Sequence, residues 1–378
     1  MPSQKRKFPF QVLLLIPAIL LMLYGLWAGL QRMGWALPQL QTGLAALHGP
    51  LMIAGFLGTL LSLERAVALR IRLFYLAPLG SAIGMALVLM GVNGAMGVVL
   101  ITLGSALMFV MMAYIVRQQT VPFTILLATG SAMWLVGNLI WLAGLGIANA
   151  VLWWSGFLIL TIVGERLELS RVLHVPRRAQ IIFWTGIALF GAGVVLDTPE
   201  RLVLPDATLF LGSRLTGLGM LVLAIWLARY DIARRNMRQT GLTRFIAICL
   251  MLGYVWLGIG GFLRLFDSGA QAGMYYDALL HTIFVGFVFG MIFAHAPIIL
   301  PSILMRPLPY APIQYVALLL LQVGLILRVA GDLMLDLNMR QWGGMLNAIA
   351  ITLYFAVTLF LLVRLSIRQA RAAQASQR

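Results

Sequence analysis

Histidine has the widest chemical use of any side chain in this sequence, and four histidines occur: His48, His174, His281 and His295. His48 and His281 each precede a Gly-Phe pair in a long apolar stretch, by seven residues before Gly55 and five before Gly286. In two equivalent helices this difference is about 3 Å of rise, so both imidazoles lie at nearly the same depth. Two such histidines can hold a haem iron from both faces. We expect His48 and His281 to be axial ligands; the alternative is that each is a hydrogen-bonded helix-packing residue.

His295 shares a register position with two glutamates. Glu64, Glu165 and His295 each follow a Gly-Phe pair, nine residues after the glycine. Two carboxylates and one imidazole at one depth can form a second metal site, a proton-loading cluster or an ion-paired brace, and all three interpretations remain open. The brace would include Arg65, Arg166, Glu168 and Arg171. His174 lies in a basic loop and is expected to be solvated.

Two arginines, Arg264 and Arg328, are expected at the depth of the histidine pair. A haem has propionates that need cations or water, and guanidinium groups bind carboxylates through paired hydrogen bonds. We therefore expect Arg264 and Arg328 to bind propionates, with pairing to Asp332 as the alternative for Arg328. Asp277, one turn before His281, is expected to orient that imidazole or simply to start its helix.

These residues stand in a chain of 378 residues that is 62% hydrophobic, with 27 basic and 11 acidic side chains. Soluble proteins devote about a quarter of their residues to charge, so the composition excludes an appended soluble domain. The single cysteine, Cys249, excludes a disulfide framework. About twelve stretches are long enough to cross a bilayer as helices. We expect an all-α polytopic membrane protein with spans near 9–31, 45–69, 73–92, 95–116, 122–145, 148–171, 179–196, 205–229, 243–266, 274–304, 311–334 and 342–365.

Spans two, six and ten share a motif that recurs every four spans. It reads Gly-Phe-Leu and later Glu-Arg in spans two and six, and Gly-Phe-Val and later His295 in span ten. The period predicts one transmembrane domain, 1–378, made of three parallel four-helix units near 9–116, 122–229 and 243–365. Spans two, six and ten would then surround a common centre.

Basic residues are concentrated in the tails and in alternate loops, and acidic residues gather in the opposite loops. The positive-inside rule therefore predicts that both termini are cytoplasmic, and we expect a bacterial-type inner membrane. The net charge of +16 reflects this topology, with some attraction to anionic lipid head groups, and not nucleic acid binding.

The segment that begins at His48 resembles the second-helix motif of the NnrS family, His-Ala-His-Glu-Met-x-x-Gly-Phe, with matches at His48, Met52, Gly55 and Phe56. Span ten is similar to that family's His-x-x-x-Val-Gly-x-x-x-x-Met-Ile segment, with matches at His281, Val285, Gly286, Met291 and Ile292. Both segments also resemble helices two and ten of haem-copper oxidase catalytic subunits. NnrS proteins are haem- and copper-containing membrane proteins associated with nitric oxide metabolism. The resemblance implies an oxidase-like architecture of twelve spans that holds one haem b.

The departures from these motifs concern the second metal. The second histidine of the NnrS motif is replaced by Pro50, which cannot bind a metal, and oxidases have a second haem ligand where this chain has Leu279. Spans six and seven contain no histidine, so copper has no clear ligands. We therefore expect no binuclear gas-reducing centre.

The resulting hypothesis is a haem b membrane protein that acts in electron transfer or in nitric oxide-linked redox handling or sensing. A quinol or a cytochrome would supply electrons, and whether the protein is an enzyme stays open. The rival hypotheses are a proton-coupled transporter that uses Glu64, Glu165 and His295, and a non-catalytic subunit of a respiratory complex.

Overall fold

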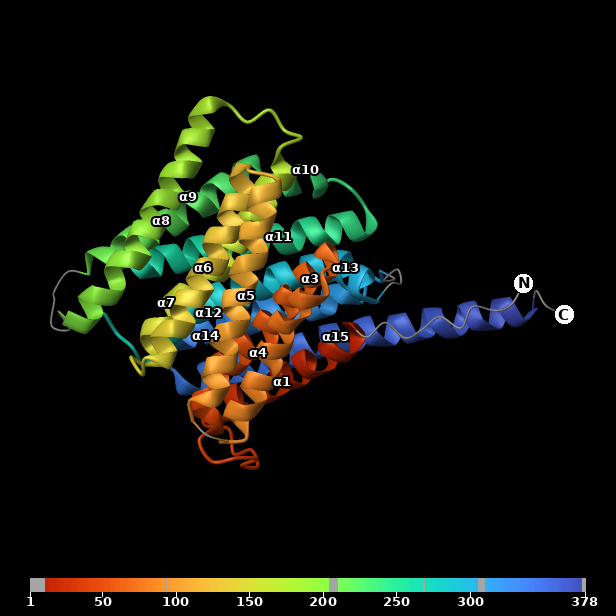
Figure 1. Ribbon diagram of the computed structural model, residues 1–378, viewed down its shortest axis with the longest axis horizontal. Helices are drawn as coiled ribbons and strands as arrows, with labels where there is room; N and C mark the ends of the chain where they lie inside the picture. Colours follow the sequence, from red (N-terminus) through yellow and green to blue (C-terminus); the bar gives the residue numbers. More distant parts are fainter. Residues whose placement is uncertain (1–10, 93, 204–209, 268, 305–309, 376–378) are drawn as a thin grey trace.

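The computed structural model describes residues 11–92, 94–203, 210–267, 269–304 and 310–375 (Figure 1). Every regular element within these residues is a helix, and no strand occurs among them. Twelve of the described helical segments are long and apolar enough to cross a membrane, which confirms the expected all-α polytopic fold. Residues 9–10 and 205–209 of the expected spans lie outside the described residues.

The spans are continuous helices or series of short helical segments, as a bilayer requires of backbone that must satisfy its own hydrogen bonds. The first six are α1 (Gln11–Arg32), η1 (Leu44–Leu47) with α2 (His48–Pro50), η2 (Leu51–Gly58) and α3 (Thr59–Leu69), η3 (Arg72–Tyr75) with α4 (Leu76–Leu89), α5 (Met96–Gln118), α6 (Pro122–Leu142) and α7 (Ile147–Ser170). The others are α8 (Arg177–Val203), α9 (Leu211–Tyr230), α11 (Gly241–Leu265), α12 (Met274–His281) with η4 (Thr282–Phe289) and α13 (Gly290–Leu304), α14 (Gln314–Met334) and α15 (Leu337–Ala375). The short α10 (Ala233–Asn236) connects α9 to α11.

Spans two, six and ten form the centre of the bundle. In their most apolar windows, 67%, 83% and 67% of the residues are buried, against 33% to 56% in the other described spans. Side chains join all three pairs, since His48 faces His281, Arg65 pairs with Glu165, and Glu165 approaches His295. The central position agrees with the shared motif, whereas the triplication of the chain stays a prediction.

The remaining spans surround this centre (Figure 1). α4, α5, α6 and α7 pack in sequence, α8 packs on α9 and α9 on α11, and α14 packs on α15. α15 has 39 residues, about 58 Å of helix at about 1.5 Å per residue, and Figure 1 shows it projecting beyond the rest of the bundle. We refer to the two ends of the bundle as the His48 end and the Glu64 end.

Two of the central spans contain a π-helical segment that the sequence analysis does not predict. η2 and η4 are each eight residues long, and the repeat glycines Gly55 and Gly286 are the fifth residue of each. A β-carbon at Gly286 would collide with Trp256, because the neighbouring helix packs directly against the π-helical turn. Such wide turns are frequent at functional sites, and both lie directly beyond the paired histidines.

Candidate haem site

His48 and His281 face each other across the centre of the bundle. Their ring centroids are 6.1 Å apart and their planes differ by 18°. Metal–imidazole bonds of about 2 Å on each side of one metal, with about 1 Å from each nitrogen to its ring centre, give a centroid separation of about 6 Å. The observed separation therefore suits two imidazoles bound to opposite faces of a single iron.

The other ring nitrogen of each histidine is held by the backbone. Nδ1 of His48 lies 2.7 Å from the carbonyl oxygen of Gly25, and Nδ1 of His281 lies 2.8 Å from that of Asp277. A carbonyl only accepts hydrogen bonds, so each Nδ1 carries the proton and donates. Each Nε2 then presents a lone pair, as an axial ligand must.

A cavity of about 100 Å³ adjoins both imidazoles. Its lining is apolar apart from the histidines, Arg328 and Asn347, and it includes the flexible side chains Leu26, Leu30, Met33, Met52 and Leu280. A porphyrin is larger than this space, so its binding would require these long side chains to repack, which flexible side chains such as Met tolerate. A β-carbon on Gly29 would lie 2.8 Å from Nδ1 of His48, so glycine at this position gives the imidazole its room.

Arg328 reaches the cavity as expected, but its partner is not Asp332. It donates two hydrogen bonds to Asp277, of 2.7 and 3.0 Å, and Asp332 lies instead 2.9 Å from Arg340. The carboxylate of Asp277 is 3.5 Å from Nδ1 of His281, farther than its backbone carbonyl. Asp277 thus orients His281 through the backbone, and its carboxylate orients Arg328.

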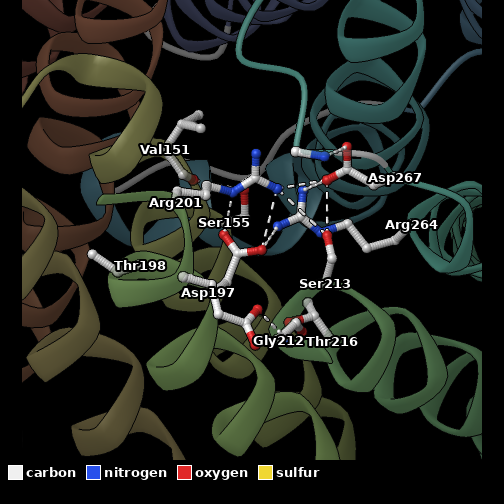
Figure 2. Close-up of polar contacts among 12 residues, drawn as sticks. Val151, Ser155, Asp197, Thr198, Arg201, Gly212, Ser213, Thr216, Arg264 and Asp267 are labelled. Carbon is white, nitrogen blue, oxygen red and sulfur yellow. Dashed lines mark hydrogen bonds and ion pairs between the residues drawn. The ribbon is translucent and has the colours of Figure 1, made fainter. Parts of the chain in front are cut away.

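Arg264 does not line this cavity. It belongs to a buried cluster of four charged side chains, Asp197, Arg201, Arg264 and Asp267, which we call the closed cluster. Figure 2 shows the two guanidinium groups between the two carboxylates. Arg264 donates to Asp197 at 2.9 Å and to Asp267 at 3.0 Å, so both of its terminal nitrogens are directed to these carboxylates. The expected role of Arg264 at a propionate therefore has no support in the geometry.

Asp267, in the loop between spans nine and ten, shows the electrostatics of the closed cluster. Burial alone raises the pKa of its carboxyl, but Arg264 and Arg201 outweigh burial, with help from the Ser213 hydroxyl, and hold the pKa below its usual value. Gly269 also donates its backbone N–H to this carboxylate, at 3.1 Å. The cluster is thus largely satisfied from within.

The three residues at the Glu64 end are brought together. Arg65 donates to Glu165 and lies 3.6 Å from Glu64, so a guanidinium stands between the two carboxylates. Nε2 of His295 is 4.0 Å from Oε2 of Glu165. Among the described residues, no three His, Cys, Asp or Glu side chains are arranged to hold a metal ion, so the geometry favours the brace or the proton-loading cluster over a second metal.

Asp231 is a further member of the brace, and its pairing is not predicted from the sequence. Arg166 pairs at 3.1 Å with Asp231, which follows α9, and not with an acid of its own helix. Burial raises the pKa of the Asp231 carboxyl, and the nearby Arg166 opposes this rise. Arg171 pairs with Glu168 as expected, at 3.5 Å. His174 is exposed, as expected.

Sequence signals existed for some of the missed partners. Asp197 and Arg201 are four residues apart and Arg264 and Asp267 three, which are the spacings of ion pairs on one helix face. The carbonyl of Gly25 has no such signal, because any helical residue offers one.

Comparison with known families gives one match: a family described as a domain of unknown function (DUF8744) matches residues 11–363. No curated protein and no solved structure matches the chain.

Proposed function

The chain belongs to the DUF8744 family, whose description names no activity. From the geometry of the site, we propose that the protein binds one haem b and uses it in electron transfer. His48 and His281 are the axial ligands. The observation that carries the proposal is the facing pair of imidazoles, 6.1 Å apart, each with Nδ1 bound to a backbone carbonyl.

The two histidines favour electron transfer over gas chemistry. A haem with both axial positions filled by imidazole exposes no iron to nitric oxide or oxygen, and a ligand could enter only if one histidine left. Such a haem changes its charge without rearranging its ligands, which suits the passage of single electrons. Nitric oxide handling, which the NnrS resemblance implies, would require the loss of one bond to iron.

The surroundings indicate how the haem would be held. Arg328 borders the cavity and, by turning from Asp277, can hold a propionate through paired hydrogen bonds. The concentration of basic residues in alternate loops supports a bacterial-type inner membrane with both termini in the cytoplasm. Quinols and cytochromes are the donor classes that such a location offers.

A reduced-minus-oxidised absorption spectrum of the purified protein tests the proposal. We expect the Soret and alpha bands of a low-spin haem b, lost in His48→Ala and in His281→Ala. His174→Ala is the matched control and should retain both bands. The near-parallel ring planes, 18° apart, further predict a rhombic low-spin signal in electron paramagnetic resonance. A folded protein without haem bands would overturn the proposal and favour the transporter hypothesis.

A further inference from the structure

A second, larger cavity lies at the Glu64 end of the same central helices. Its volume is about 660 Å³, within the range of about 300–1,000 Å³ usual for ligand sites. It lies among α1, α3, α7, α13 and α15 and opens to the surface of the bundle, where Ile16, Leu20 and Leu359 are exposed. Its lining is almost wholly aliphatic and aromatic. Glu165 and His295 are the ionisable residues that line it. An occupant must therefore be largely apolar, with a polar group at one end.

The two ionisable side chains of this cavity, Glu165 and His295, both present hydrogen-bond acceptors to it. Nδ1 of His295 lies 2.9 Å from the carbonyl oxygen of Met291 and must donate to it, so Nε2 presents a lone pair. Oε1 of Glu165 accepts from Arg65, whereas Oε2 faces Nε2 of His295 across 4.0 Å. Nε2 is buried and has no hydrogen-bond partner among the residues that the structure describes. Two facing acceptors call for a ligand that donates, since buried polar groups are rarely left unpaired.

These features select a chemical class. A fatty acid or a phospholipid phosphate would bring a negative charge to Glu165, which is unfavourable at low dielectric. A hydroxyl donates without adding charge. Phe355, which packs edge-to-face on the buried Phe56, lines the cavity and is an aromatic contact for a flat ring. We propose that this cavity binds a lipophilic quinol, with one ring hydroxyl donating to His295 or Glu165 and the isoprenoid tail among the aliphatic residues.

The quinol cavity adjoins the haem cavity. Leu57 lines both, and Phe56 of the quinol cavity stacks at 6.1 Å on Phe289 of the haem cavity. Oxidation of a quinol to the quinone breaks two O–H bonds and releases two protons and two electrons. A bound haem would accept the two electrons one at a time, with an oxidised cytochrome taking the first electron from it before the second arrives, and the two protons would pass to His295 and Glu165. The use of the quinol as donor rests on the proposed function, whereas its binding does not.

Anaerobic equilibrium binding of decylubiquinol to the His281→Ala protein tests binding without haem. We expect the quinol to bind at least ten-fold more tightly than decylubiquinone. The quinone has only carbonyl oxygens, which cannot donate a hydrogen bond to His295 or Glu165. Glu165→Gln should weaken quinol binding at least ten-fold and reduce this preference. Glu168→Gln is the matched control on the same helix, since Glu168 does not line the cavity and pairs with Arg171.

A second variant guards against a folding defect in the first. Ala296 lines the cavity, and Ala296→Phe should abolish binding of both redox forms by filling the space. Equal affinity for the two forms, or binding unaffected by Ala296→Phe, would overturn the proposal and indicate a lipid-filled groove.

Haem reduction in the unmodified protein separates this inference from the proposed function. Decylubiquinol should reduce the haem, at least ten-fold more slowly in Glu165→Gln, while dithionite reduces both proteins fully. Haem that dithionite reduces and decylubiquinol does not would contradict the quinol site alone. The absence of haem bands would instead contradict the proposed function, and the binding assay would still decide on the cavity.

Discussion

Two clusters at the His48 end contain the same side chains, two aspartates and two arginines, in different surroundings. In the closed cluster both arginines donate to both aspartates, over distances of 2.6 to 3.1 Å (Figure 2). The second set, which we call the open cluster, borders the haem cavity and consists of Asp277, Arg328, Asp332 and Arg340. There the ion pair of Asp332 and Arg340 is poorly aligned for a hydrogen bond, and neither oxygen of Asp332 has a hydrogen-bond partner within the described part of the chain.

The two clusters differ in how completely their charged groups are hydrogen-bonded. The closed cluster joins α8, α9 and the end of α11, and every carboxylate oxygen in it accepts a hydrogen bond. Within the described residues, only Nε of Arg264 is left there without a partner. The open cluster keeps unused hydrogen-bonding capacity beside a cavity and beside an imidazole. Residue type and depth are shared, so the two clusters differ in their unpaired carboxylate oxygens, which within the described residues occur only in the open cluster, at Asp332.

The largest expected effect comes from Asp197→Asn in the closed cluster. Removal of one carboxylate leaves two buried guanidinium groups with one acid, which costs about 3–5 kcal/mol of unfolding free energy. Asp332→Asn should cost less, about 1 kcal/mol, because Arg340 keeps Asp277 as a partner at 3.5 Å and is not left as an uncompensated buried charge. Thermal unfolding in detergent measures both. Equal losses of stability in the two variants would contradict the proposed difference between the clusters.

Arg328→Gln should act on the haem more than on the fold. Loss of a group that binds a propionate and holds Asp277 is expected to weaken haem retention by about 10–100-fold. Haem-to-protein ratio after dialysis against apomyoglobin is the measurement. Arg264→Gln, in the closed cluster, should lower stability while the folded fraction keeps its haem; haem loss there would contradict the separation of the clusters.

Gly29→Ala tests the room around His48. The added methyl would lie 2.8 Å from two ring atoms, and such overpacking costs about 1–3 kcal/mol. We expect a weakened low-spin spectrum without loss of the protein. Gly191→Ala, in α8, meets no atom within 4 Å and should keep the spectrum unchanged.

The smallest effect concerns pH. The depressed pKa of Asp267 means that its carboxylate stabilises the fold above the unfolded-state pKa of about 3.9 and that this stabilisation is lost as pH falls through the folded-state value. The contribution of the closed cluster to the melting temperature of the protein should thus be constant from about pH 8 to pH 5 and should decrease below about pH 4. A loss already at pH 6 would show that the cluster is held by groups other than its aspartates.

Sequence reasoning found the fold because a bilayer imposes length and apolarity on every span. It also placed His48 and His281 opposite each other, since the motif register fixes depth. It failed for Arg264, because depth says nothing about the direction in which a side chain points around the helix axis. The π-helical segments η2 and η4 locally change the direction in which side chains point, and no residue pattern predicts these segments. The pairing of Arg166 with Asp231 depends on how α7 and α9 approach, which spacing along one helix cannot reveal.

The stacked rings of Phe56 and Phe289, with Leu57 beside them, form an apolar floor between the two cavities. No group in that floor can hydrogen-bond a water molecule, so a proton has no chain along which to hop. An electron needs no such chain, because it tunnels through packed carbon. This apolar layer would therefore allow electron transfer between the two cavities but not proton transfer. The protons of an oxidised quinol would remain in the cavity where they were released.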